Sequence, residues 1–188
     1  MAPPGIPVPC ILTARAYLCF NSLGQTGEEK HAMTDTKYDK YFVHETKASP
    51  LHPEGGFPWI PLMRVDDRFM KGAFYFECIW LTGPIPESKA YKPHSHDCDE
   101  YVGFFSGSVD DPFNLDAEVE FWFDDEKHVF TKNCLIFIPA GIWHSPVIIN
   151  RMKRPIFCLS TSPTTKYTQK VNRDPRWSHL EDPPEGKL

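Results

Sequence analysis

The sequence predicts an all-β domain. A succession of short apolar or alternating segments is separated by turns that contain Gly and Pro, and helical periodicity is almost absent. The chain has 188 residues, of which 41% are hydrophobic and 14% aromatic, so it can bury one sizeable core. Two packed sheets, arranged as a barrel or a sandwich, are the architectures that this pattern favours.

The predicted strands begin after residue 40 and follow one another with short turns between them. Residues 72–81 are rich in aromatic and β-branched side chains, which favour strands. In residues 117–123, Val119, Phe121 and Phe123 alternate with two glutamates, which is the period-two pattern of a half-buried strand. The other predicted strands are 41–44, 91–96, 101–105, 128–130, 134–138, 143–149 and 156–160.

Both ends of the chain differ in composition from the region between them. Residues 1–36 are rich first in Pro and then in Gly, Gln and Glu, whereas residues 163–188 are polar and basic. Segments of this kind seldom pack against a core. We therefore expect one domain at 37–162, a mobile N-terminal extension over 1–36, and a polar C-terminal tail over 163–188 that is mobile or draped on a neighbouring chain.

Composition also excludes several kinds of partner. The formal net charge is -5 and no basic stripe is present, so we expect no binding to nucleic acid. No segment reaches the run of about 18 apolar residues that a membrane helix needs, so we expect no membrane span. The six cysteines are scattered without a CxxC pair. We interpret them as reduced thiols of a cytoplasmic protein.

Four side chains are candidate metal ligands: His94, His96, Glu100 and His144. Successive side chains of a strand alternate between its faces, so His94 and His96 point the same way. Glu100 stands at the head of the next predicted strand, and His144 follows a Pro-Ala-Gly turn. Three imidazoles and a carboxylate suit one divalent transition metal, Fe, Mn, Cu, Ni or Zn. Cys98 lies between the ligands in sequence, but we expect its loop to turn the thiol away.

The order of these ligands resembles a known family. The segment from His94 to Glu100 has the pattern His-x-His-x-x-x-Glu, with six residues between Glu100 and Gly107, and resembles the first motif of the cupin superfamily. The pattern Pro-x-Gly-x-x-His that ends at His144 resembles its second motif. The resemblance implies a double-stranded β-helix, the cupin jelly-roll barrel, with a single metal site. It also implies pairing into a homodimer.

The same alternation predicts the lining of a substrate pocket. If Glu100 points into the barrel, Val102 and Phe104 do as well, and if His144 points inward, so does Ile148. Tyr75 and Trp80, from the strand at 72–81, are further candidates. These walls are mostly apolar and suit a small organic substrate.

Three functions remain open at this point. The first is a metal-dependent oxidoreductase, most of all a dioxygenase, that acts on a small organic molecule. The second is a non-redox isomerase, lyase or cyclase that uses the metal as a Lewis acid, with Glu100 as a catalytic general base. The third is a small-molecule binding protein without turnover, since a fold alone does not dictate a reaction.

Overall fold

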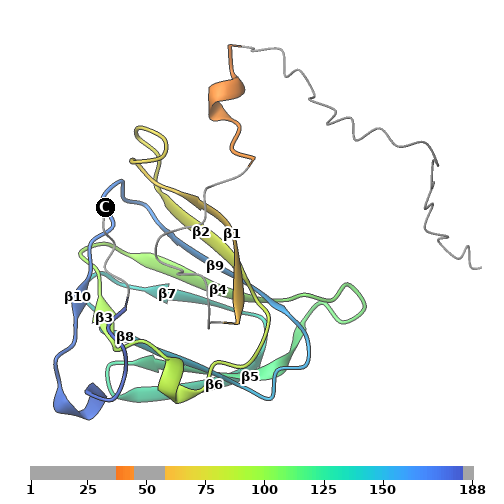
Figure 1. The fold of residues 1–188 in the computed structure, drawn as a ribbon, viewed down its shortest axis with the longest axis vertical. Coiled ribbons are helices and arrows are strands. Elements are labelled where there is room, and N and C mark those ends of the chain that lie inside the picture. The colour runs from red at the N-terminus through yellow and green to blue at the C-terminus, as the bar shows by residue number, and fades with distance from the viewer. Residues whose placement is uncertain (1–36, 45–57, 184–188) are drawn as a thin grey trace, which may run out of the picture. The chain divides into compact units, whose positions relative to one another are not determined.

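The structure is a computed structural model that describes residues 37–44 and 58–183 (Figure 1). The chain divides into two units, residues 1–40 and 41–188. Residues 37–40 are the described part of the first unit, and the second unit contains all the strands of the described chain. The predicted extension over 1–36 and the last residues, 184–188, lie outside the described residues.

Ten strands within the described ranges form two antiparallel sheets (Figure 1). Sheet A has the strand order β1–β2–β9–β4–β7, and sheet B has the order β10–β3–β8–β5–β6. The strands are β1 (Trp59–Val65), β2 (Tyr75–Leu81), β3 (His94–Ser95), β4 (Glu100–Ser106), β5 (Asn114–Phe123), β6 (Glu126–Lys132), β7 (Cys134–Ile138), β8 (His144–Asn150), β9 (Ile156–Ser162) and β10 (Lys170–Val171).

The chain crosses between the sheets in the order expected for a jelly roll. It runs from β2 in sheet A to β3 in sheet B, then from β4 in sheet A to β5 in sheet B. After the hairpin of β5 and β6 it returns through β7, β8 and β9, each of which inserts beside a strand of the outward path. This interleaving is the double-stranded β-helix, so the predicted all-β jelly-roll fold is confirmed.

Helical structure in the described residues is limited to three short 3-10 segments. These are η1 (Asp39–Tyr41), η2 (Glu87–Lys89) and η3 (Pro175–Trp177). None of the helices in residues 37–44 and 58–183 is long and apolar enough to span a membrane.

The core lies between the inward faces of the two sheets. Phe104 of β4 and Phe121 of β5 are 1% and 2% exposed, and Ile149 and Ile156 are fully buried. Full burial of one such side chain stabilises the fold by about 1.5–3 kcal/mol, so this cluster supplies most of the rigidity behind the site. Gly107, which closes the first motif, must lack a side chain, because a Cβ there would collide with the backbone carbonyl of Pro155.

The structure corrects the prediction of a mobile tail for residues 163–183. Strand β10 pairs with β3, so the segment extends sheet B (Figure 1). Beyond it, Trp177 and Leu180 are 7% and 4% exposed, and Trp177 meets the ring of Trp122 edge-on with the centroids 5.4 Å apart. Two isolated apolar anchors in a polar segment produce no periodicity, which is why composition alone missed this docking.

Burial of Trp177, and not the surface ion pairs, should hold the C-terminal segment in place. We expect Trp177→Ala to lower the free energy of unfolding by about 3 kcal/mol. Lys170→Ala, which breaks an exposed ion pair with Asp97 at 2.7 Å, should lower the free energy of unfolding far less than Trp177→Ala. Urea unfolding of both variants measures the difference, and equal small losses would show that the segment does not pack on the domain.

Candidate metal centre

The fold brings the two sequence motifs into direct contact. His94 of β3 and His144 of β8 are Cα partners across sheet B, and Glu100 opens β4 in sheet A. Between them, the backbone N–H of Gly141 donates to the carbonyl of His96 at 2.8 Å. Gly141 has a φ of 82°, a conformation that glycine adopts without strain, so the turn before His144 can reach back to the first motif.

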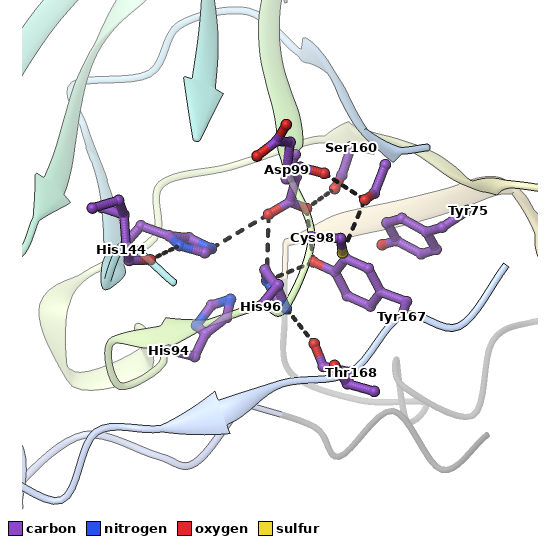
Figure 2. Close-up of polar contacts among 12 residues, drawn as sticks. Tyr75, His94, His96, Cys98, Asp99, His144, Ser160, Tyr167 and Thr168 are labelled. Carbon is purple, nitrogen blue, oxygen red and sulfur yellow. Dashed lines mark hydrogen bonds and ion pairs between the residues drawn. The ribbon is translucent and has the colours of Figure 1, made fainter. Parts of the chain in front are cut away.

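The three histidines form a compact group between the sheets (Figure 2). One ligand atom from each of His94, His96 and His144 lies within 4.8 Å of the others. His96 and His144 are each 3% exposed. Glu100 is 2% exposed, and its Oε2 lies 3.3 Å from His96 Nε2 and 3.4 Å from His144 Nε2. The structure therefore brings together all four side chains that the sequence selected.

Each imidazole places its Nδ1 against a backbone carbonyl oxygen. The distances are 2.7 Å from His96 to Thr168, 3.1 Å from His144 to Ile142 and 3.2 Å from His94 to Lys92. A carbonyl oxygen only accepts, so Nδ1 carries a proton in each ring, and in a neutral ring Nε2 is then the nitrogen with a lone pair. Metal-binding histidines have this arrangement.

The tautomers leave a buried carboxylate facing imidazole lone pairs. Glu100 Oε2 is buried and has no hydrogen-bond donor among the described residues. Burial acts to raise the pKa of Glu100, whereas positive charge on the side of His144 and His96 acts to hold it well below its usual range. Burial and the neighbouring rings of His144 and His96 lower the pKa of His94 to about 3, so that ring is neutral. An anionic oxygen beside neutral nitrogen donors fits a divalent cation.

The other carboxylate oxygen of Glu100 is anchored from the opposite side. Ser160 Oγ and the Tyr167 hydroxyl both donate to Oε1, the latter at 2.7 Å. Tyr167 also lies 2.7 Å from His96 Nε2, and its ring stacks on Tyr75 with the centroids 4.0 Å apart (Figure 2). Burial and the charge of Glu100 raise the pKa of Tyr167 well above its usual value, so it is a neutral phenol.

Sequence reasoning missed both anchors. Tyr167 lies in the segment that we expected to be a mobile tail, and nothing in its sequence neighbourhood signals a site. Ser160 belongs to a predicted strand, two residues after Cys158, so both side chains lie on the same face of that strand. Because that face points inward, the spacing could have identified Ser160 as a candidate residue of the site. Thr168, whose carbonyl orients His96, contributes only backbone and is invisible to a search for side-chain motifs.

A cavity of about 200 Å³ adjoins the centre. His94, Glu100 and His144 are part of its wall, together with Tyr75 and Val102. Two of the five predicted pocket residues, Tyr75 and Val102, therefore line this cavity. Phe104 also faces inward, but it lines a second cavity farther along β4.

Trp80 and Ile148 lie on outward faces, so the prediction is wrong for both. On β2 the inward positions are Tyr75, Glu77, Ile79 and Leu81, and Trp80 instead packs edge-on against Phe157, with centroids 5.5 Å apart. On β8 a register shift opposite β5 adds one residue after His144. Beyond the shift, the positions that face inward are offset by one residue. Val147 therefore faces the cavity, and Ile148 faces outward.

Cys98 is not part of the histidine group. Its sulfur lies 3.1 Å from Ser162 Oγ, and burial raises the pKa of the thiol. In the described part of the chain, Cys78, Cys98, Cys134 and Cys158 are all free thiols. The donor set at the centre is therefore nitrogen and oxygen.

Comparison with known proteins finds similarities among solved structures. No family model matches the sequence, and no curated protein matches it. Among solved structures, the chain is similar to an oxalate oxidase in complex with the substrate analogue glycolate (TM-score 0.45, 14% identity, 74% of this chain and 67% of that one). It is also similar to a sugar phosphate isomerase from a cupin superfamily, from Silicibacter pomeroyi DSS-3 (TM-score 0.40, 18% identity, covering 62% of this chain and 66% of that one). A third is the polyketide cyclase RemF from Streptomyces resistomycificus (TM-score 0.40, 14% identity, 64% and 77%).

Likenesses at these scores and identities assign no substrate or reaction to the chain. The strand order and the meeting of the two motifs define the class: the chain has the cupin fold, with a group of three histidines that could hold a metal ion.

Removing one imidazole should abolish stoichiometric metal binding. We expect His96→Ala and His144→Ala to lose the ion while most of the barrel stays folded, because neither ring is a member of the apolar core cluster. The matched control is His128→Ala, since that side chain is 54% exposed on β6. Metal content by elemental analysis, with circular dichroism for the fold, measures the effect. Full occupancy in both site variants would show that the metal lies elsewhere.

Proposed function

We propose that the chain is a metal-dependent enzyme that acts on a small organic molecule, with oxygenation or oxidative cleavage as its leading reaction. The observation that supports this most directly is the common orientation of the three histidines, which place Nδ1 against backbone carbonyls and gather one ligand atom each within 4.8 Å of the others beside a buried carboxylate. Such donors are needed for a metal and are of little use to a simple apolar binding site.

His94, His96, Glu100 and His144 would hold the metal. When bound, a redox metal there would activate dioxygen and polarise an oxygen atom of the substrate. Four protein ligands leave one or two coordination positions for that purpose. The adjoining cavity has apolar walls, Val102 and Val147 among them, which would exclude water and orient an organic substrate.

The chain's own residues also offer proton transfer. Glu100 is the proposed general base when its Oε2, which faces the histidines, leaves the metal, while Ser160 and Tyr167 keep its Oε1 occupied. The neutral Tyr167 hydroxyl beside this carboxylate favours a second candidate, a non-redox isomerase, lyase or cyclase. Such reactions move a proton next to a carbonyl group and need no oxidant. A binding protein without turnover would not require this pairing.

The metal that the protein carries distinguishes these candidates. Protein purified without a metal-binding tag and without added metal should contain close to one equivalent of Fe, Mn or Cu. It should also consume oxygen with phenolic or diketone substrates. Zn or Ni, together with exchange of substrate protons for deuterium and no oxygen uptake, would support the non-redox candidate. No metal after reconstitution would contradict both.

The carboxylate should contribute to the metal as well as to proton transfer. We expect Glu100→Gln to weaken metal affinity by about 10–100-fold, because the neutral amide removes the anionic ligand while preserving shape. Glu126→Gln, at a side chain that is 79% exposed, is the control. Competition with a chromophoric chelator measures both affinities. Unchanged affinity in Glu100→Gln would remove the carboxylate from the site.

We also propose that the protein is a homodimer. The outward face of sheet A exposes Tyr101, Leu135 and Phe137 by 42%, 56% and 48%, and the Tyr101 and Phe137 rings lie 5.1 Å apart across the β4–β7 pair. Contiguous apolar side chains on a sheet face favour burial against a partner.

The free thiols support a reducing compartment, and we propose the cytoplasm.

The apolar face of sheet A provides the test of the dimer. We expect the double variant Leu135→Glu and Phe137→Glu to be monomeric, since two buried charges would oppose association. Val109→Glu, at a side chain that is 93% exposed in a loop, should leave the mass unchanged. Light scattering after gel filtration gives the molar mass, and a monomeric natural protein would contradict the proposal.

A further inference from the structure

A second cavity of about 150 Å³ lies between the sheets, beyond the one that adjoins the metal centre. Its walls are almost entirely apolar and include Ile79, Leu81, Ile85, Phe104 and Cys158. Cys158 belongs with the apolar walls, because burial raises the pKa of its thiol to about 12 and keeps it neutral. An apolar cavity of this size can hold a benzene ring.

The two cavities are adjacent and share part of their walls. Trp59, Tyr91, Val102, Ser145 and Val147 line both of them. Trp59 and Tyr91 also contact each other there, with ring centroids 6.1 Å apart. A molecule that enters one cavity can therefore extend along the same wall into the other.

The inward faces of three strands change from polar to apolar along this direction. On β9, Ser160 lines the cavity at the metal centre and Cys158 lines the second one. On β4, Glu100 lies in the first cavity and Phe104 in the second, with Val102 shared between them. Strand β2 has the same order, because Glu77 lines the first cavity and Ile79 and Leu81 line the second. The metal centre is thus at the polar end of one continuous inner surface.

We propose that the second cavity binds the apolar part of a ligand whose oxygen-bearing head reaches the metal centre. The substrate class is then a carbonyl or hydroxyl compound that carries an aliphatic chain or an aromatic ring. A small, fully polar acid or a sugar phosphate would leave the second cavity without a partner. This inference rests on the proposed metal-dependent function and names the chemistry of its substrate.

Alkyl hydroxamates of different length provide a direct test, because their two oxygen atoms bind a metal and their chains supply the apolar part. Calorimetry would compare acetohydroxamate with hexanohydroxamate on the zinc-loaded full chain. Each buried methylene tightens binding by about fourfold. Hexanohydroxamate should therefore bind at least tenfold more tightly than acetohydroxamate.

A larger side chain in the second cavity should remove this gain. In Cys158→Phe the two hydroxamates should bind equally, while the affinity for acetohydroxamate stays that of the natural protein. Cys158→Leu, a smaller change that the core tolerates more easily, should remove part of the gain. Leu159→Phe is the matched control, because Leu159 is the next residue of β9 and faces away from the second cavity. Its register partner on β4 is Gly103, on the outward face, whereas Cys158 pairs with the inward-facing Phe104. In Leu159→Phe, hexanohydroxamate should bind more tightly than acetohydroxamate by the same factor as in the natural protein.

The outcomes separate the inference from the function on which it rests. If acetohydroxamate binds the zinc-loaded protein and the longer chain adds nothing, the second cavity is no ligand site. A gain that persists in both Cys158 variants contradicts the inference equally. If acetohydroxamate does not bind at all, the proposed metal function itself is wrong.

Discussion

Hydrogen bonds from three imidazole Nδ1 atoms to backbone carbonyls determine what this site can be. They orient His94, His96 and His144 within one compact group, in which Nε2 of His96 and Nε2 of His144 lie beside the carboxylate of Glu100. Buried polar groups without partners are costly, so such a grouping is stable when a cation lies among them. The remainder of the fold can be understood as the support of this arrangement.

The jelly roll supplies that support from both sheets. Sheet B places His94 and His144 side by side, and sheet A contributes Glu100 together with its anchor Ser160. The C-terminal segment completes the site, because Thr168 orients His96 and Tyr167 donates to Glu100. Docking of Trp177 is therefore coupled to the chemistry, since the same segment carries both the core anchor and two groups of the site.

Motif spacing predicted the fold and the grouping of the four candidate ligands, because local alternation and turn chemistry determine where those residues lie. His94 and His96 share a strand region, and the turn before His144 contains the glycine that its φ of 82° favours. The errors have equally local causes. The register shift on β8 turned Ile148 outward, and period two on β2 left Trp80 on the outer face. Tyr167 could not be predicted, because tertiary contacts alone bring it to Glu100.

The central claim is that three imidazoles and one carboxylate hold a single metal, and X-ray absorption spectroscopy of the metal-loaded protein tests it most directly. The predicted spectrum has only nitrogen and oxygen in the first shell, with the multiple-scattering pattern of three histidine rings. A sulfur scatterer, which would implicate Cys98, or the pattern of fewer than three rings would contradict the account.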